Sequence, residues 1–159
     1  MITNTYKSFL DKLLQDIKAK GIDVSNCNLD HIGYQCSSDL DYDGLKPDFE
    51  RLGKLVSENL VGGRRVGIFE LNSPLTYEDR KIPAIELIAP KENQKCPSAL
   101  EHAEFVIDDD FNSFIEKYPN LNWDLTAVNQ LTFPMVKLKL SETTQVKFHY
   151  RPVLEIVKK

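Results

Sequence analysis

The chain has 159 residues, which suits one ordinary domain or two tightly fused half-domains, and its 42% hydrophobic and 28% charged content predicts a packed core and argues against disorder. The net charge is −4 and no run of lysine or arginine exceeds two, so the sequence gives little electrostatic support for nucleic-acid binding. The apolar runs are far shorter than the roughly 20 residues that a membrane helix needs, and three cysteines without a CxxC spacing favour reduced thiols in a cytoplasmic protein.

The N-terminal segment, residues 1–25, predicts an amphipathic helix that docks on the rest of the chain. Its apolar residues recur at the 3.6-residue period that places them on one helix face: Tyr6, Phe9, Leu10, Leu13, Leu14 and Ile17. Thr3 or Asn4 can cap the start of this helix, and Gly21 can end it. Charged residues are scattered through the segment, so we expect no signal peptide.

An alternating stretch, CNLDHIGYQCS at 27–37, predicts the first strand. His31, Gly33 and Gln35 fall on one side of this strand, and the more apolar residues fall on the other. An acidic turn then leads into a second predicted helix. The buried stripe of this helix is expected to contain Leu45, Phe49, Leu52, Leu55 and Val56.

Two further strands complete the first half of the chain. RRVGIFELN, which follows two glycines, predicts one strand, and PAIELIAP at 83–90 predicts the other. Prolines bracket the expected hairpin turn between them. Glu86 interrupts the otherwise apolar run of the second of these strands, so it is a candidate for a functional position.

After a polar linker at 91–98, the same order of elements begins again. LEHAEFVI at 100–107 predicts a strand with His102 and Glu104 on one face. DDDFNSFIEKY predicts a short helix with acidic residues at its N-terminus, where they favour the helix dipole. FPMVKLKL and TQVKFHYRP predict two strands joined by a polar hairpin turn.

Each half therefore reads as a strand, a helix and about three strands, which is a βαβββ module used twice. The first module is expected at 26–92 and the second at 98–159, after the helix at 1–25. The prediction is one α+β domain, residues 1–159, in which both modules belong to one chain. A monomer can then complete the site, and a dimer is equally compatible.

Four polar residues occupy similar places in the two modules. His31 and His102 lie in the first strands, and Glu86 and His149 lie in the last strands, 55 and 47 residues further along the chain. If the modules pair about a pseudo-twofold axis, these side chains can converge in one cavity. A lone histidine in a strand is more often a satisfied or surface residue, but all three histidines of this chain occupy such positions. Imidazoles with a carboxylate suit a divalent ion such as Fe, Mn, Ni, Co or Zn.

Other polar residues are candidates for supporting roles. Glu104 shares a face with His102 and can orient a ligand histidine. Arg64 can bind a substrate carboxylate or phosphate, and Arg151, two residues from His149, can do the same. Gln35 shares the face of His31. Each of these has an equally good reading as an ordinary surface side chain.

The acids that directly precede the two strand histidines, Asp30 and Glu101, are expected on the opposite strand face and are poor ligand candidates. No HExxH, GxSxG, P-loop or GxGxxG motif is present, so no catalytic residue is assigned. The spacing of the candidate ligands therefore identifies no reaction.

At this point the chain resembles the YecM family within the vicinal oxygen chelate (glyoxalase/bleomycin-resistance/dioxygenase-like) superfamily. The stretches that carry the resemblance are DHI (30–32), LVSENLVGGRRVGIFELNSPL (55–75), IEL with Pro90, EHAEFV (101–106), KFH (147–149) and the closing LEIV. They extend over nearly the whole chain and are specific when taken together and in order.

The resemblance implies paired βαβββ modules that form a cupped mixed sheet around a central site, with metal ligands on the first and last strands. The ligand positions carry over onto His31, Glu86, His102 and His149. Arg64 and Glu104 also match the family pattern, whereas Arg65 stands where the pattern has proline. Members of the family are described as candidate metal-binding proteins without an assigned reaction, so the resemblance implies a site and leaves the substrate open.

Three functions are compatible with the sequence. The favoured one is a metalloenzyme acting on a small molecule by isomerase, lyase or dioxygenase-like chemistry. The alternative is a metal-free module that binds or sequesters a small molecule, and the third is a structural or interaction role with no cavity. A small-molecule substrate or ligand is the expected partner, and neither nucleic acid nor a membrane is expected.

Overall fold

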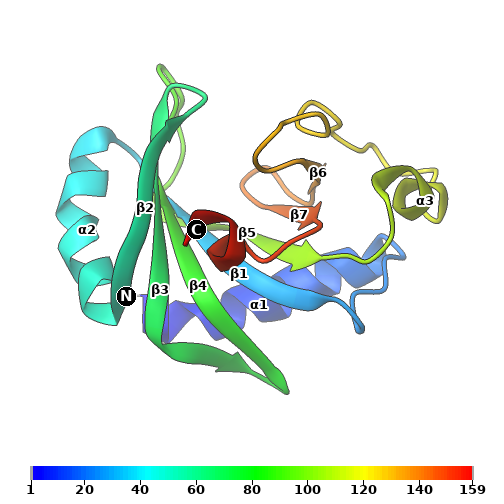
Figure 1. Cartoon of the computed structure of the whole chain (residues 1–159), viewed down its shortest axis with the longest axis horizontal. Coiled ribbons are helices and arrows are strands. Elements are labelled where there is room, and N and C mark those ends of the chain that lie inside the picture. The colour runs from blue at the N-terminus through cyan, green and yellow to red at the C-terminus, as the bar shows by residue number, and fades with distance from the viewer. Residues whose placement is uncertain (1, 159) are drawn as a thin grey trace.

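Seven strands form one continuous mixed sheet that curls around its inner face (Figure 1). The structure is a computed structural model that describes residues 2–158. The strands are β1 (Asn28–Gln35), β2 (Gly53–Val61), β3 (Arg64–Tyr77), β4 (Arg80–Ile88), β5 (Ala99–Val106), β6 (Met135–Lys139) and β7 (Gln145–His149). The helices are α1 (Ile2–Ala19), α2 (Asp39–Leu52), α3 (Phe111–Glu116) and α4 (Val153–Val157).

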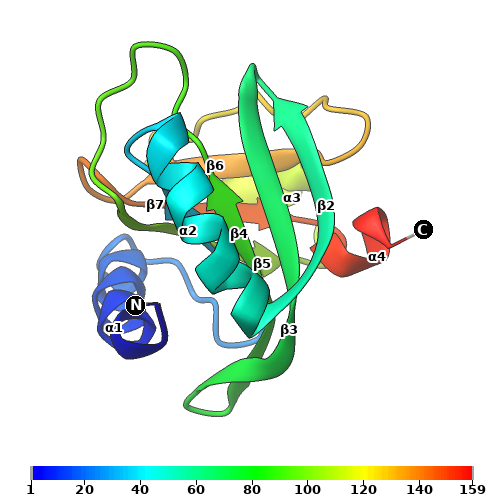
Figure 2. The same ribbon diagram turned by 90° about the vertical axis from the view of Figure 1, so that its left-hand side faces the viewer.

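The strand order, β2-β3-β4-β1-β5-β7-β6, places the three histidine-bearing strands, β1, β5 and β7, next to one another in the sheet. β1 is parallel to β4 and antiparallel to β5, and β5 is parallel to β7. Helices α1 and α2 lie on one side of the sheet and α4 lies on the other (Figure 2). The predicted α+β class, with a mixed sheet and an additional N-terminal helix, is confirmed.

The N-terminal helix buries the apolar face that its periodicity predicts. Tyr6, Leu10, Leu13 and Ile17 are all buried in the hydrophobic core. Gly21 follows the helix with a φ of +81°, the left-handed conformation that glycine adopts without steric cost. Among the described residues, no helix is long and apolar enough to cross a membrane.

The second helix is shorter than predicted, because the chain changes from helix to strand at Gly53. Leu55 and Val56, which were expected on the helix face, belong to β2, a strand that the periodicity did not reveal. A Cβ at Gly53 would lie 2.2 Å from the carbonyl oxygen of Glu70 on β3, so only glycine allows β2 to begin so close to its partner. Two glycines, Gly62 and Gly63, then turn the β2-β3 hairpin with positive φ.

The second half of the chain has two strands after its helix, whereas about three were expected. The strand that would correspond to β2 is reduced to an isolated bridge between Asp124 and Lys137. The closing residues Val153–Val157, which had no predicted structure, form the short helix α4. As a result the inner face of the second half is bordered by irregular chain and by α4, and no complete fourth strand is present there.

Candidate metal centre

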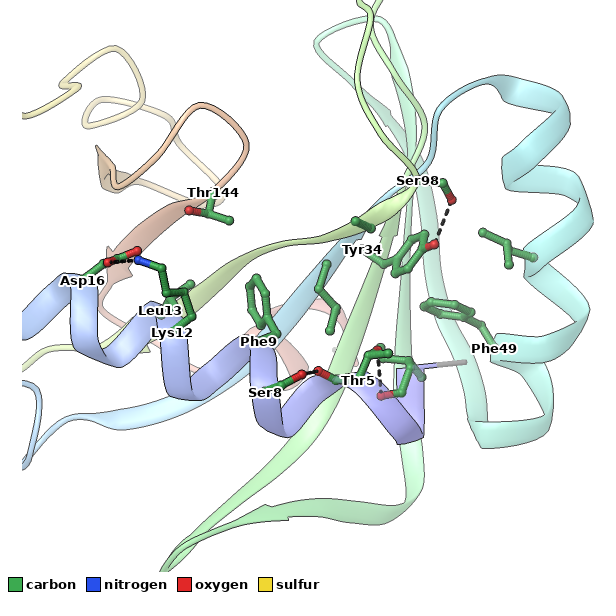
Figure 3. Close-up of a pocket in the computed structure, with 14 residues that line it drawn as sticks. Thr5, Ser8, Phe9, Lys12, Leu13, Asp16, Tyr34, Phe49, Ser98 and Thr144 are labelled. Carbon is green, nitrogen blue, oxygen red and sulfur yellow. Dashed lines mark hydrogen bonds and ion pairs between the residues drawn. The ribbon is translucent and has the colours of Figure 1, made fainter.

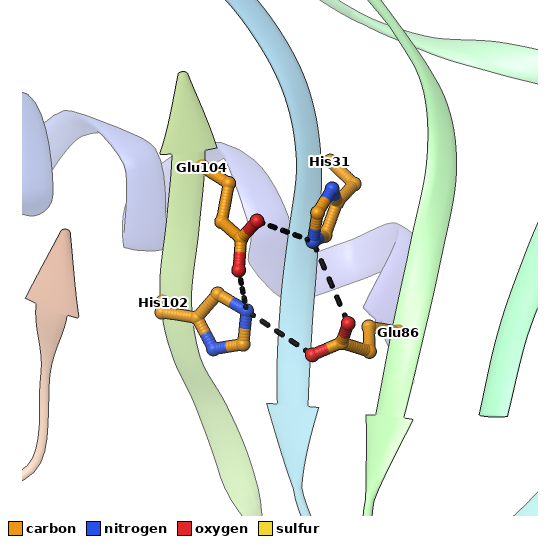
Figure 4. Close-up of side chains that lie close together, drawn as sticks. All are labelled: His31, Glu86, His102 and Glu104. Atoms are coloured by element: carbon orange, nitrogen blue, oxygen red, sulfur yellow. Dashed lines mark ion pairs between the residues drawn. The ribbon is translucent and has the colours of Figure 1, made fainter. Parts of the chain in front are cut away.

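Two histidines and two glutamates from three adjacent strands point toward one another on the inner face of the sheet (Figure 4). We call this group the His/Glu cluster; its members are His31 on β1, Glu86 on β4, and His102 and Glu104 on β5. All four are buried. Nε2 of His31 lies 3.6 Å from Glu86 and 3.3 Å from Glu104, and Nε2 of His102 lies 3.4 Å from Glu86 and 3.5 Å from Glu104.

A glycine on the central strand allows His102 to reach Glu86. Gly33 pairs with Glu86 on one side and with His102 on the other, so the two side chains meet across the β1 backbone. A Cβ at residue 33 would lie 2.1 to 2.6 Å from three atoms of the His102 ring. The ring therefore occupies the space that any other side chain at this position would fill.

Each histidine of the cluster is held by the acid that precedes it in the sequence. Nδ1 of His31 donates to Asp30 at 2.8 Å, and Nδ1 of His102 donates to Glu101 at 2.6 Å. Because an ionised carboxylate only accepts, these bonds keep a proton on Nδ1 and direct Nε2 toward the cluster centre.

The prediction that these acids lie on the opposite strand face is wrong, because both strands carry a bulge. The pairing of β1 with β5 shifts between Leu29 and His31, so Asp30 is an extra residue, and it shifts again so that Glu101 is an extra residue on β5. A bulge breaks the two-residue alternation and re-aims the side chain. The bulge positions are the repeated acid-histidine pairs of LDH and LEH.

These two acids are also anchored themselves. Asp30 accepts the backbone N–H of Val153 at 3.0 Å, which ties the start of α4 to β1. Glu101 accepts from the Gln145 side chain at 2.6 Å. Hydrogen bonds of this kind fix the ring orientation of a metal-binding histidine and raise its basicity.

His149 lies beside the His/Glu cluster and is not one of its members. The register explains this: Gly33 pairs with Glu86 in the first half as Glu104 pairs with Lys147 in the second, so the residue that corresponds to Glu86 is Lys147. His149 stands one strand repeat further along. Its ring stacks on Phe133 at 4.7 Å, and its Nε2 lies 3.5 Å from Asp30 and 3.7 Å from Glu104.

The remaining sequence candidates separate into two groups. Arg64 reaches Gln35, donating to its amide oxygen at 3.3 Å, and Gln35 is fixed in turn by hydrogen bonds to the backbone oxygens of Cys36 and Ile88. Arg151 does not join them. The alternation that placed it beside His149 stops where β7 ends, and the exposed Arg151 lines none of the cavities described below.

Sequence reasoning missed Lys147 as a site residue. Its side chain is only 8% exposed, and its Nζ lies 3.6 Å from Glu104. A lysine on an alternating strand is normally interpreted as a solvated residue. Only the pairing of Lys147 with Glu104 on β5 identifies it as a residue of the site.

The ring nitrogens that face the cluster centre have no hydrogen-bond partner. Within residues 2–158, the buried side-chain atoms without such a partner are Nε2 of His31, Nε2 of His102, Oε2 of Glu104 and both ring nitrogens of His149. The donor atoms of the cluster all lie within 4.8 Å of one another. Donors at about 2.0–2.2 Å from one ion stand roughly 3–3.5 Å apart, which fits the cluster distances of 3.3 to 3.6 Å. The residues therefore fit a divalent first-row ion.

The charges of the cluster are coupled. Burial opposes ionisation of His31, but Glu104 and Asp30 hold its pKa well above the usual value. Burial and Lys147 also oppose ionisation of His102, but its hydrogen bond to Glu101 and the nearby carboxylate of Glu86 raise its pKa. Despite burial, His31 and Lys147 hold the pKa of Glu104 well below the usual value. Without a metal ion, protons on the histidines thus balance the buried carboxylates, and an ion would displace those protons.

We expect Glu101 to make the metal-free protein sensitive to acid. Although burial raises its pKa, the hydrogen bond and charge of His102 lower it to about 2. A depressed carboxyl pKa stabilises the fold above the unfolded value near 4.3, and this contribution, on the order of 3 kcal/mol, is lost as pH falls toward 2. Urea unfolding of chelator-treated Glu101→Gln should lose less stability than wild type between pH 5 and pH 3. The exposed Glu50→Gln is the control, and equal losses in all three proteins would contradict this role.

Two open cavities lie on opposite faces of the sheet. One, of about 610 Å³, adjoins the cluster and is lined by Glu86, Glu104, Lys147 and Arg64 among others. The other, of about 670 Å³, lies against α1 and α2 (Figure 3) and contains no residue of the cluster. Of these two cavities, the first is therefore the one that borders the His/Glu cluster.

Comparison with known proteins places the chain among bacterial relatives. The family model described as YecM protein matches residues 1–150. Protein YecM of Escherichia coli (strain K12) is 27% identical over 109 residues, which cover 69% of this chain and 58% of that protein. An uncharacterized protein of Haemophilus influenzae is 28% identical over 137 residues, which cover 84% and 68% of the two chains. The match thus spans less than two thirds of the Escherichia coli protein.

A solved structure has the same fold. It is described as "Structural Genomics, Protein EC4020", and it superimposes with a TM-score of 0.79 at 23% identity, covering 95% of this chain and 86% of that one. At this identity the likeness concerns the fold alone.

Proposed function

The chain belongs to the YecM family, and from the buried His/Glu cluster we propose that it is a metal-dependent enzyme of the vicinal oxygen chelate superfamily that acts on a small molecule. The observation that carries the proposal is the pair of buried imidazole nitrogens, on His31 and His102, that face two carboxylates and have no hydrogen-bond partner. Leaving such groups unsatisfied costs about 1–3 kcal/mol each, a cost that a bound ion removes.

We assign the ion to His31, His102, Glu86 and Glu104. Asp30 and Glu101 would orient the two imidazoles, and His149 would stand next to the ion without completing the set. Fe, Mn, Co, Ni and Zn all suit this donor set, because availability as well as affinity selects among them. All the donors come from one chain, so a monomer can hold the ion.

Such an ion supplies Lewis acidity toward an oxygen of the bound molecule. Glu86 is the cluster residue best placed to take part in proton transfer, because its side chain is 11% exposed whereas that of Glu104 is 2% exposed. Isomerase, lyase and dioxygenase-like reactions all use these elements, and the proposal extends to the site without selecting among them.

Metal analysis tests the proposal directly. We expect chelator-treated protein, incubated with each of Fe²⁺, Mn²⁺, Co²⁺, Ni²⁺ and Zn²⁺ and then desalted, to retain one ion per chain with at least one of them. Glu86→Gln removes one charged donor with almost no change in shape, so it should lower the affinity for the metal at least about tenfold. Glu116→Gln, on the exposed surface of α3, should bind as wild type does.

Retention of no ion under any of these conditions would exclude the metal-dependent function. The cavity beside the cluster would then support the metal-free binding module. In that case His31→Ala combined with His102→Ala should leave ligand affinity unchanged.

A further inference from the structure

The cavity beside the His/Glu cluster is chemically divided along its length. Glu86, Glu104 and Lys147 line it, and so does Arg64, whose partner Gln35 pairs with Ile88, one strand repeat from Glu86. Most of the remaining wall is apolar: Val66, Ile68, Ile88, Phe133, Met135, Val153, Ile156 and Val157. At the mouth, Leu131 and Leu60 are 101% and 73% exposed. A molecule that fills this cavity must therefore present both charged or polar groups and apolar surface.

Arg64 is a cation without an anionic partner. Arg51 and Arg65 pair with aspartates, Arg80 donates to two backbone carbonyl oxygens, and Arg151 is exposed. Half-buried Arg64 has only the Gln35 amide oxygen among the described residues. Its planar group is thus held in place, by an amide that is itself fixed, with donors left for an oxyanion.

The sheet register gives an approximate distance between Arg64 and the His/Glu cluster. Gln35, which holds the Arg64 guanidinium, pairs with Ile88, and Glu86 lies one repeat away on the same strand and face. One repeat is about 7 Å. The wall between the two positions is formed by Val66 and Ile88, which pair with each other across β3 and β4.

The charge in and around the His/Glu cluster decides which end of the cavity receives an anion. Asp30, Glu86, Glu101 and Glu104 bring four negative charges, and a divalent ion with Lys147 leaves a net negative charge there. An anionic group is therefore better placed at Arg64, and a neutral oxygen is better placed at the ion.

We propose that the ligand of this cavity is an amphipathic monoanion: a carboxylate or similar oxyanion bound by Arg64, an apolar body along Val66, Ile88 and Phe133, and a neutral carbonyl or hydroxyl oxygen about 7 Å away at the cluster. The proposal rests on the metal-dependent function for its third element only. Arg64 and the apolar wall define the first two without an ion.

Three probes separate the elements of this ligand. They are 4-acetylbenzoate, whose ring separates the carboxylate from the ketone, its uncharged methyl ester, and levulinate, which keeps the keto acid but lacks the ring. We expect calorimetric titration of Zn²⁺-loaded protein to show the aromatic keto acid, 4-acetylbenzoate, binding at least about tenfold more tightly than either of the others, because each lacks one element of recognition. Arg64→Gln should weaken binding of the acid about 10- to 100-fold and leave the affinity for the ester unchanged.

Arg151→Gln is the matched control, because it removes an exposed arginine outside the cavity. Failure of the acid to bind at millimolar concentration, equal binding of acid and ester, or an unaltered affinity in Arg64→Gln would each overturn the proposal. Retained ions are counted in every sample. The acid could bind to protein that retains no ion, and Arg64→Gln could weaken that binding. In that case the monoanion assignment stands and only the metal-dependent function fails.

Discussion

Replacing Gly33 by alanine is expected to abolish metal retention, although residue 33 offers no ligand atom. The new Cβ would lie within 2.6 Å of Cε1, Nε2 and Nδ1 of His102. That ring is fully buried and fixed by Glu101, so it can escape only by leaving the position from which Nε2 faces Glu86. Loss of one histidine donor should lower metal affinity by at least about 100-fold. Competition with a chromophoric chelator measures the change.

The same substitution should destabilise the metal-free protein, because overpacking of a buried position costs roughly 1–3 kcal/mol. Gly44→Ala is the control. It lies within α2 with no heavy atom within 4 Å of the added Cβ, so it should leave metal affinity unchanged and raise helix stability by about 0.5–1 kcal/mol. If Gly33→Ala retains one ion per chain with wild-type affinity, His102 is not a ligand and the proposed donor set is incorrect.

The sequence was sufficient to predict most elements, because periodicity reports which face of an element is buried. It failed where two periodic signals ran together. Leu55 and Val56 continue the spacing of the α2 stripe, so the change to β2 at Gly53 was not visible. The second-half counterpart of β2 was expected from the module pattern, but only the Asp124–Lys137 bridge remains. β2 is an edge strand that pairs with β3 alone, so a module can lose its counterpart without interrupting the rest of the sheet.

The sequence predicted which strands carry the site residues, but it did not predict which residues of neighbouring strands pair. Alternation correctly placed His31 and Glu86 on one face, because β1 and β4 are regular between them. It misplaced Asp30 and Glu101, because bulges add one residue to β1 and one to β5. Those bulges are long-range features. They exist only once β1 and β5 pair, so they cannot be predicted from the alternation within either strand.

The sequence predicts His149 as a ligand from its separation from His102, and this stays a prediction; the register places Lys147, and not His149, at the position that corresponds to Glu86. The sequence separations of 55 and 47 residues include loops and an edge strand that differ between the halves, so they do not show which residues pair across neighbouring strands. The pairing of Glu104 with Lys147 does. At the position that corresponds to Glu86 the second half thus carries a cation, and the carboxylate is supplied one strand earlier by Glu104.

This difference separates two ligand sets by experiment. We expect Glu104→Gln to lower metal affinity at least about 100-fold, because it removes a charged donor within 3.3 Å of His31 and 3.5 Å of His102. His149→Gln should lower it less than about tenfold, since the His149 ring stacks on Phe133 beside the cluster and only borders Glu104. Both changes are made in the same assay, with Co²⁺ absorption as a second readout of the donor set.

The comparison is decisive because the two residues are almost equally buried and both face the same carboxylate-rich space. A general loss of packing would therefore affect both variants alike, and chelator-treated unfolding measures that part separately. The reverse result, with His149→Gln losing the ion and Glu104→Gln keeping it, would restore His31, Glu86, His102 and His149 as the ligands. Glu104 would then serve to balance Lys147 and His31, whose charges it already faces at 3.6 Å and 3.3 Å.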